Sequence, residues 1–222
     1  MKTPQTFDTL GLSAKTLAAI QKKGFVTPTA IQAMTIPLML SNTANIIAQA
    51  QTGTGKTAAF GLPLIELIDT GKRQVQALIL VPTRELAMQV SDEITSLNES
   101  LDLKVAPIYG GQAIDQQLYK LKRGVHIVVG TPGRVIDHLK RKTLDLGKIE
   151  HLIFDEADEM LNMGFIEDME EIMKHTNPDK RTLLFSATMP DKIKELAHKY
   201  MDGYEFLSAK EENTEVPLTE QI

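Results

Sequence analysis

A glycine-rich segment of the chain has the composition of a phosphate-binding loop. It reads Ala50-Gln51-Thr52-Gly53-Thr54-Gly55-Lys56-Thr57, and it follows an apolar run and precedes a helical pattern. Glycines let backbone N–H groups turn towards a phosphate, and the N-terminus of the next helix adds partial positive charge. In this arrangement Lys56 reaches the β- and γ-phosphates of a nucleotide, and the Thr57 hydroxyl ligates Mg²⁺. The alternative is a glycine-rich turn that binds nothing, since Ala50 stands where the usual pattern has its first glycine.

A second segment supplies carboxylates at the end of an apolar run. His151-Leu152-Ile153-Phe154 is followed directly by Asp155-Glu156-Ala157-Asp158. At the carboxyl end of a buried strand, Asp155 can hold Mg²⁺ through its coordination shell, and Glu156 can polarise an attacking water as a general base. The alternative is that these acids only cap a helix, because Asp and Glu favour its first turn. Beside the phosphate loop, the segment predicts nucleotide hydrolysis with Lys56, Asp155 and Glu156 as the catalytic residues.

Two hydroxyl side chains close another apolar run. Ser186-Ala187-Thr188 comes directly after residues 182–185. Hydroxyls at the end of a strand can bridge the acidic segment to a part of the molecule that moves. More often, such residues only satisfy a turn.

These segments belong to an alternation of apolar runs and helical patterns. Residues 84–98 and Asp191–Tyr200, for example, place apolar side chains on one face at helical spacing. Several of the apolar runs are apolar nearly throughout, as strands buried on both faces of a parallel sheet are. The alternation predicts an α/β fold with a mostly parallel, twisted, doubly wound sheet and helices on both faces. The runs predict seven strands, at residues 45–50, 75–81, 104–109, 125–129, 151–154, 182–186 and 204–207.

The two ends of the chain differ from this middle part. Residues 1–40 carry helical patterns without a strong strand, with Pro28 and Pro37 as breakers, and are expected to form an N-terminal helical extension. Residues 41–209 are expected to form the α/β domain. The polar residues 210–222 are expected to form a linker or a frayed tail.

Composition limits the class of protein. The 222 residues include no cysteine, which excludes disulfides, a thiolate nucleophile and Cys-ligated metal sites, and the five histidines show no metal-ligand spacing. No segment approaches the roughly 20 apolar residues of a membrane span, and no signal-peptide pattern is seen, so a cytoplasmic protein without a membrane partner is expected. The formal net charge of −5 gives no support to nucleic-acid binding by bulk electrostatics. Any contact with RNA or DNA must therefore come from a local site.

Taken together and in order, the motifs resemble those of the DEAD-box ATP-dependent RNA helicases. The acidic segment consists of the four letters for which that family is named. The resemblance extends from Phe7 to about Tyr200, and it includes the family's adenine-reading motif at Gly24-Phe25-Val26-Thr27-Pro28-Thr29-Ala30-Ile31-Gln32. It implies a RecA-like phosphate-loop NTPase domain, with ATP and Mg²⁺ as cofactors and RNA as a partner. Ala30 departs from the family, which usually has proline there, so the turn before Gln32 is expected to be less rigid.

The resemblance also implies which residues bind the nucleotide. The amide of Gln32 can both donate and accept, as N6 and N7 of adenine require, so it is expected to select ATP over GTP. Phe7 matches an aromatic residue that stacks on the base in the family; otherwise it anchors the N-terminal arm to the domain. Thr57 and Asp155 are the expected Mg²⁺ ligands. The loop residues expected to bind the phosphates are Gln51, Thr52, Gly53, Thr54, Gly55, Lys56 and Thr57.

Three further elements match family elements that touch RNA. They are Pro82-Thr83-Arg84-Glu85-Leu86-Ala87, Gly110-Gly111 and Thr131-Pro132-Gly133-Arg134. Arg84 and Arg134 each lie near a threonine at a predicted helix start, where the helix end and a guanidinium can bind a phosphate without reading bases. Either arginine alone is as easily a surface salt bridge, and the glycines a simple turn. Ser186-Ala187-Thr188 matches the element that couples hydrolysis to strand separation, which implies a coupling role for Ser186 and Thr188.

One family feature has no match in the sequence. The family has a second RecA-like domain whose arginine-rich motif completes the ATP site. We therefore expect the chain to be the N-terminal half of a longer helicase, with residues 210–222 as the start of the interdomain linker. Such a half is expected to bind ATP or ADP weakly, hydrolyse slowly and not unwind RNA, because an arginine at the γ-phosphate is worth about 10³–10⁵ in rate.

Two other functions stay open on the sequence alone. One is a different phosphate-loop ATPase, such as a transporter motor, whose signature Leu-Ser-Gly-Gly-Gln shares only three letters with Ile108-Tyr109-Gly110-Gly111-Gln112. The other is a nucleotide-dependent RNA clamp in which hydrolysis is dispensable. The intact Lys56, Asp155 and Glu156 argue against the clamp.

Overall fold

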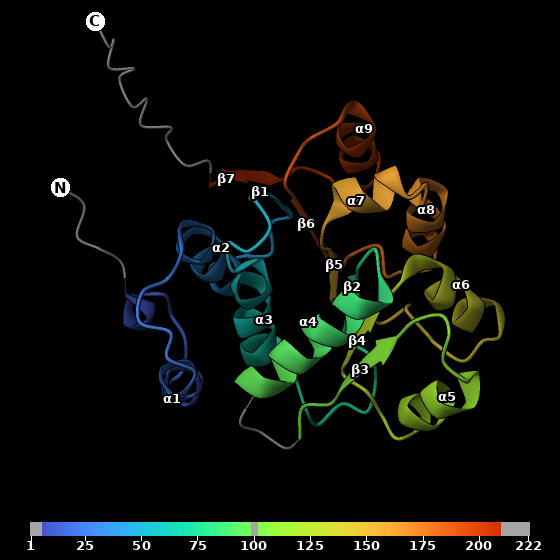
Figure 1. The fold of residues 1–222 in the computed structure, drawn as a ribbon, viewed down its shortest axis with the longest axis horizontal. Helices are drawn as coiled ribbons and strands as arrows, with labels where there is room; N and C mark the ends of the chain where they lie inside the picture. The colour runs from blue at the N-terminus through green and yellow to red at the C-terminus, as the bar shows by residue number, and fades with distance from the viewer. Residues whose placement is uncertain (1–5, 99–101, 210–222) are drawn as a thin grey trace, which may run out of the picture.

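A seven-stranded sheet forms the centre of the protein (Figure 1). The computed structural model describes residues 6–98 and 102–209, so the predicted linker at 210–222 lies outside the described residues. The strand order is β3-β4-β2-β5-β6-β1-β7, and every pair of neighbouring strands is parallel. The strands are β1 Ile46–Gln49, β2 Ala77–Leu80, β3 Val105–Ile108, β4 Ile127–Gly130, β5 His151–Phe154, β6 Arg181–Ser186 and β7 Glu205–Ser208.

Helices cover both faces of this sheet. Figure 1 shows α3 on one side of the sheet and α8 on the other. Within the described residues, no helix is long and apolar enough to cross a membrane. The helices are α1 Ala14–Lys22, α2 Ala30–Ser41, α3 Lys56–Leu67, α4 Arg84–Leu97, α5 Ile114–Lys122, α6 Pro132–Lys140, α7 Ala157–Asn162, α8 Ile166–Lys174 and α9 Asp191–Tyr200, preceded by a short 3₁₀ helix at Phe7–Thr9.

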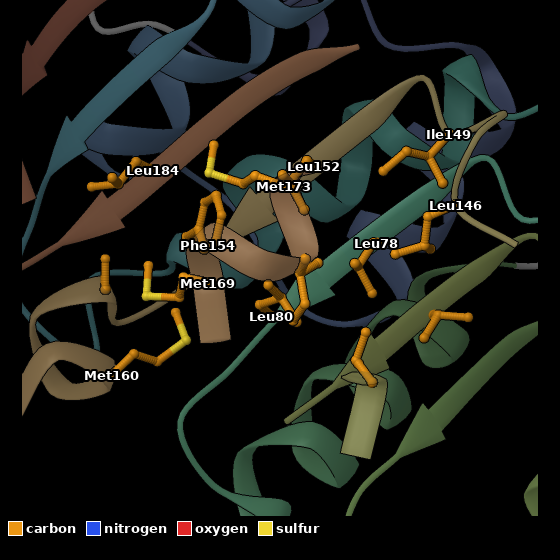
Figure 2. Close-up of a cluster of buried hydrophobic side chains, with 14 of the residues drawn as sticks. Leu78, Leu80, Leu146, Ile149, Leu152, Phe154, Met160, Met169, Met173 and Leu184 are labelled. Carbon is orange, nitrogen blue, oxygen red and sulfur yellow. The ribbon is translucent and has the colours of Figure 1, made fainter. Parts of the chain in front are cut away.

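The strands contribute side chains to two hydrophobic clusters, one on each face of the sheet. Successive strand side chains point to opposite faces, so Leu78 and Leu80 of β2 enter one cluster and Ala77 and Ile79 the other. Figure 2 shows the first cluster, where strand side chains meet methionines such as Met160 of α7. Burial on both faces explains why inner strands such as β2 and β4 are continuous apolar runs. All seven predicted strands are confirmed, with bounds within two residues of the structure.

Pro37 does not break a helix, and that prediction was wrong. It lies inside α2, which continues to Ser41. A proline inside a helix removes one backbone hydrogen bond. Here the helix continues because it packs against α3 and buries Ile31 and Met39 in the core. The predicted boundary at residue 40 thus falls inside α2, and the division into 1–40 and 41–209 stays a prediction.

A buried arginine ties α2 to the amino-terminal edge of the sheet. Arg181 begins β6, is 5% exposed, and burial lowers its pKa to about 10. The carbonyls that it binds include the end of α2, where a cation is favoured by the helix dipole. Its guanidinium donates hydrogen bonds to four carbonyl oxygens, those of Leu38, Met39, Asn42 and Ala44.

Arg181→Met is expected to lower the free energy of unfolding by about 2–3 kcal/mol, because several buried carbonyls lose a charged donor. Urea denaturation measures this change. Lys192→Met, on the exposed face of α9, is the control and should shift stability by less than about 0.5 kcal/mol. Equal effects of the two substitutions would contradict the assigned role of Arg181.

Candidate functional site

The predicted site motifs lie at one edge of the sheet, because each follows the carboxyl end of a parallel strand. The glycine-rich loop follows β1, the acidic motif follows β5, and Ser186 ends β6. Strands β5, β6 and β1 are neighbours in that order, so the loop and the acidic motif flank the end of β6. The strand order therefore joins segments that are far apart in the sequence.

The loop between β1 and α3 has the backbone of an anion site. Gly53 and Gly55 adopt left-handed φ angles of +82° and +81°. Gly55 is the N-cap of α3 and provides no side-chain cap, so the first N–H groups of this 12-residue helix are left for another acceptor. A phosphate is favoured at such a helix end.

Gln32 packs directly against this loop. Its Nε2 donates to the carbonyl oxygen of Gly55 at 3.0 Å, and its Oε1 accepts from the N–H of Thr29 at 2.9 Å. The side chain is buried, with 4% of the residue exposed. The amide that was predicted to read adenine is thus already engaged, and it keeps one N–H and one oxygen lone pair for a base. Adenine recognition by Gln32 stays a prediction.

Gly55→Ala is expected to disturb both the loop and Gln32. A Cβ at this position would lie 2.4 Å from Nε2 of Gln32, on a left-handed backbone that L residues rarely adopt. We expect the affinity for Mg²⁺–ADP to fall at least about tenfold, with a stability loss of about 1–2 kcal/mol. Titration with a fluorescent nucleotide measures the affinity. Gly133→Ala, where a Cβ meets open space, should leave it unchanged; unchanged affinity in Gly55→Ala would contradict the prediction.

Lys56 and Asp155 meet across the end of β6. Nζ of Lys56 lies 4.0 Å from Oδ1 of Asp155, and both side chains are buried. Within the described residues, Oδ1 of Asp155 is a buried oxygen without a hydrogen-bond partner. Burial raises the pKa of Asp155 to about 6, although the charge of Lys56 opposes this shift. A buried carboxylate oxygen that lies 4.0 Å from a lysine and has no hydrogen-bond partner in the described part of the chain suits a magnesium–phosphate group.

Side chains alone do not form a complete cation site here. Among the described residues, no cluster of three or more His, Cys, Asp or Glu could hold a metal ion. Magnesium is usually bound through one or two carboxylates together with waters and substrate phosphates. The predicted ligands Thr57 and Asp155 fit that pattern, and their role stays a prediction.

Glu156 carries a strained backbone next to this pair. Its φ of 56° and ψ of 51° are left-handed, which costs a non-glycine residue about 1–3 kcal/mol. The hydroxyl of Thr52 donates a long hydrogen bond of 3.5 Å to Oε1 of Glu156. The carboxylate therefore lies beside the phosphate loop. Strain of this kind is typical of active sites.

The hydroxyls of the third motif bind Asp158, to which the sequence assigned no role. Thr188 donates to Oδ2 of Asp158 from its backbone N–H at 2.9 Å and from its hydroxyl at 2.8 Å. Ser186 accepts from the N–H of Asp158 at 3.2 Å. Burial favours a higher pKa for Asp158, but these hydrogen bonds outweigh it and hold the pKa below its ordinary value. The two motifs are thus joined through one carboxylate.

The other predicted elements follow the neighbouring strands β3, β4 and β2. Gly110-Gly111 follows β3, Thr131-Pro132-Gly133-Arg134 follows β4, and Pro82-Thr83-Arg84 follows β2. These three elements form the face that we call the phosphate-backbone face. It shares the carboxyl edge of the sheet with the nucleotide loop but lies over different strands.

Contacts within this face connect its three elements. A Cβ on Gly111 would lie 3.6 Å from Nη1 of Arg84, and Nη2 of Arg134 donates to the carbonyl oxygen of Gln112 at 3.2 Å. Arg84 is exposed and forms an ion pair with Glu85, so the salt-bridge interpretation describes its state here. Exposed pairs are worth about 0–1 kcal/mol, which a phosphate can displace.

The two threonines of this face differ in their bonding. The hydroxyl oxygen of Thr83 accepts from the N–H of Leu86 and caps α4 at 3.2 Å. Thr131 is the N-cap of α6 and makes no side-chain cap there. Thr131 therefore does not use its hydroxyl as a cap, while at the start of α6 Pro132 has no N–H and Arg134 donates its N–H to the carbonyl oxygen of Thr131 at 3.2 Å.

Phe7 lies in a hydrophobic cluster of the N-terminal segment. It is 5% exposed and packs with residues such as Leu10, Ile36 and Leu62. Its ring stacks on Phe25 with centroids 6.5 Å apart, and Phe25 is the more exposed ring, at 37%. The structure thus gives Phe7 the anchoring role. Stacking of Phe7 on a base stays a prediction.

A comparison with known families shows to which family this combination of fold and motifs belongs. The model of the DEAD/DEAH box helicase family matches residues 29–196. The chain belongs to this family. The match spans the DEAD-box motifs from Gln32 to Thr188 and leaves Phe7 outside it.

Curated DEAD-box relatives are similar over nearly the whole chain. The DEAD-box ATP-dependent RNA helicase CshA of Geobacillus kaustophilus is 51% identical over 216 residues, which are 97% of this chain and 46% of the relative. A probable ATP-dependent RNA helicase of Methanocaldococcus jannaschii is 56% identical over 204 residues, 92% of this chain and 55% of the relative. The chain spans about half the length of the curated relatives it matches.

Solved DEAD-box structures share the fold. The crystal structure of a DEAD box protein from the hyperthermophile Methanococcus jannaschii superposes with a TM-score of 0.90 at 56% identity, covering 92% of this chain and 56% of that one. A hypothetical ATP-dependent RNA helicase from Sulfolobus tokodaii gives 0.82 at 39% identity, covering 89% and 57%. The predicted α/β RecA-like fold is confirmed.

Proposed function

We propose that this chain is the ATP-binding, N-terminal half of an ATP-dependent RNA helicase that uses hydrolysis to unwind short RNA duplexes. The observation that carries the proposal is the buried pair of Lys56 and Asp155, in which Oδ1 of Asp155 has no hydrogen-bond partner among the described residues. The names of the relatives, ATP-dependent RNA helicases, support it. Because the chain spans about half of their length, the activity belongs to a longer polypeptide that contains it.

The nucleotide lies at the ends of β1, β6 and β5 in this proposal. Lys56 and the backbone of residues 51–55 bind its phosphates, and Thr57 and Asp155 hold Mg²⁺. When bound, Mg²⁺ neutralises charge on the phosphoryl group that is transferred. Glu156 orients the attacking water and accepts its proton on a carboxylate oxygen.

The RNA backbone lies on the phosphate-backbone face. Arg84 and Arg134, with the helix ends at Thr83 and Thr131, bind phosphates without reading bases. Gly110-Gly111 lets the backbone approach closely. Such local contacts need no positive net charge, which accommodates the formal charge of −5. The chain is proposed to act in the cytoplasm.

Ser186 and Thr188 are proposed to couple the two sites to domain movement. Both bind Asp158, two residues after Glu156, so a shift of the acidic motif on hydrolysis moves Thr188. A second RecA-like domain in the longer polypeptide supplies the arginines at the γ-phosphate. Without them, hydrolysis is expected to be slower by about 10³–10⁵.

The proposal is tested by nucleotide binding and phosphate release in the chain and in a polypeptide with both halves. We expect the chain to bind Mg²⁺–ADP, Lys56→Ala to weaken binding at least about tenfold, and RNA to stimulate hydrolysis only when both halves are present. Failure of the chain to bind nucleotide, or equal binding by Lys56→Ala, would contradict it. Robust RNA-stimulated turnover by the chain alone would overturn the need for a second domain.

A further inference from the structure

A series of buried side-chain hydrogen bonds links α6 and α5 to the loop after β3. Nε2 of His138, on α6, lies 3.0 Å from Oε1 of Gln117, on α5. Nε2 of Gln117 donates to the carbonyl oxygen of Tyr109 at 2.9 Å and to Oε1 of Gln112 at 3.1 Å. Tyr109 and Gln112 flank the two glycines of the phosphate-backbone face. His138 and Gln117 are 0% and 1% exposed, so water does not compete for these bonds.

The hydrogen-bond pattern fixes the orientation of both side chains. The amide nitrogen of Gln117 faces two oxygen acceptors, so its oxygen faces His138 and Nε2 of the ring carries the proton. Burial and the nearby charge of Arg134 lower the pKa of His138, which keeps the ring neutral. Nδ1 lies 2.8 Å from the hydroxyl of Thr143, which also lies within hydrogen-bond distance, at 3.1 Å, of the carbonyl oxygen of His138.

These bonds end on residues that hold the phosphate-backbone face together. Gln112 accepts from Arg134 through its carbonyl oxygen, and Gly111 approaches Arg84. The glycine loop has little packing of its own: a Cβ on Gly110 would meet nothing within 4 Å, and Gly111 has a left-handed φ of +87°. Tyr109 packs against a hydrophobic cluster of the core, and the loop beyond it is held by the hydrogen bonds of Gln117 to Tyr109 and Gln112.

Stability alone does not account for two buried polar side chains at this place. Their hydrogen bonds only roughly offset the loss of water, and apolar residues of similar shape can be as stable. Hydrogen bonds are directional, so each bond of the polar pair fixes the position of one partner atom. Here the bonds fix the position of the glycine loop.

We propose that Gln117 and His138 are positioning residues for the RNA backbone. They hold the loop of residues 109–112 so that Arg84 and Arg134 present their guanidinium groups to the same stretch of phosphates. The inference rests on the proposed function, since it takes RNA as the ligand of this face. The bracing of the loop itself can be measured without RNA.

The first test uses NMR relaxation to measure the backbone mobility of the glycine loop in this chain. Gln117→Leu is expected to lower the amide order parameters of Gly110 and Gly111 from about 0.85 to below about 0.6. Gln76→Leu is the matched control: Gln76 is also 1% exposed and makes two side-chain bonds to the backbone of Asp69. It should cost comparable thermal stability without loosening the glycines. Unchanged order parameters in Gln117→Leu would overturn the inference.

The second test measures binding of a labelled oligouridine at low salt by fluorescence anisotropy. Gln117→Leu is expected to weaken RNA binding about tenfold, while Gln76→Leu changes it less than about twofold and neither alters affinity for ADP. His138→Phe, which keeps a ring of similar size, should repeat the pattern and replaces Gln117→Leu if that variant does not fold. Equal RNA affinities in these variants and the wild type would overturn the inference. An absence of RNA binding by the wild type would instead contradict the proposed function. The order parameters would still show whether Gln117 and His138 hold the glycine loop in place.

Discussion

Asp155→Asn is expected to raise the free energy of unfolding of this chain by about 1–3 kcal/mol at pH 7.5. It is also expected to remove the contribution of the Asp155 carboxylate to ATP hydrolysis. Burial raises the pKa of this carboxyl from 3.8 to about 6, even with Lys56 only 4.0 Å away. Each pKa unit corresponds to about 1.4 kcal/mol, so the folded chain holds the ionised carboxylate at a cost of about 3 kcal/mol. Asparagine keeps the shape and removes the charge.

The raised pKa of Asp155 determines how the stability gain from Asp155→Asn depends on pH. The folded chain binds the Asp155 proton more tightly than the unfolded chain, so stability falls as pH rises from about 4 to about 6. The gain from Asp155→Asn should therefore be small near pH 4 and complete above about pH 6.5. Burial lowers the pKa of His151 to about 4, which gives the opposite slope, but this slope is common to both proteins and cancels in the difference.

Urea denaturation at a series of pH values measures the difference. Asp158→Asn is the matched control, because hydrogen bonds from Thr188 and Ser186 hold the pKa of Asp158 below its ordinary value. That substitution should lower stability where Asp155→Asn raises it. In a polypeptide with both halves, Asp155→Asn should also slow RNA-stimulated phosphate release at least about 10²-fold. A variant that is less stable than the wild type at pH 7.5 would contradict the account of Asp155.

Glu156→Gln is expected to slow RNA-stimulated ATP hydrolysis by about 10²–10⁴-fold in a polypeptide with both halves. The glutamine keeps the shape and the contact with Thr52, but it cannot accept the proton of the attacking water. Nucleotide affinity should stay within about threefold, because Glu156 is not assigned to the phosphates or to Mg²⁺. Phosphate release and fluorescent-nucleotide titration separate the two effects.

Glu159→Gln, at an exposed acid in the helix that Glu156 precedes, is the control for this change and should leave both quantities unaltered. Full activity in Glu156→Gln would contradict the assignment of the general base. It would favour the RNA clamp, in which binding of the nucleotide is sufficient and hydrolysis is dispensable.

The strands and the edge that carries the site follow from local sequence. A strand buried on both faces needs only a short apolar run, as in Ala77–Leu80, and such runs stand out without knowledge of their neighbours. Parallel strands place their carboxyl ends at one edge, so each motif that follows a strand lies there. The order of the strands is different, because no local pattern states that β6 lies between β5 and β1. The 4.0 Å approach of Lys56 to Asp155 depends on that order.

The long-range partners of polar side chains could not be predicted from the sequence. Gln32 suits adenine by its chemistry, and its contact with Thr29 is a local capping box of α2, but its bond to Gly55 depends on the packing of α2 against the loop. Gln117 and His138 are 21 residues apart and belong to no repeating pattern, so neither could be assigned a role from local sequence. Likewise, the sequence predicts that Pro37 breaks a helix, and the prediction fails because the packing of α2 on α3, which keeps the helix intact, is not a local property.

Nucleotide and RNA are proposed to bind the same edge of the sheet over different strands, and chemical-shift mapping of backbone amides distinguishes the two sites. We expect Mg²⁺–ADP to shift amides at 51–57 and 155–156, which follow β1 and β5. Single-stranded RNA should shift amides at 83–84, 110–112, 131 and 133–134, which follow β2, β3 and β4. RNA shifts confined to the nucleotide loop or to the opposite edge near Arg181, or no response of 51–57 to ADP, would contradict the account.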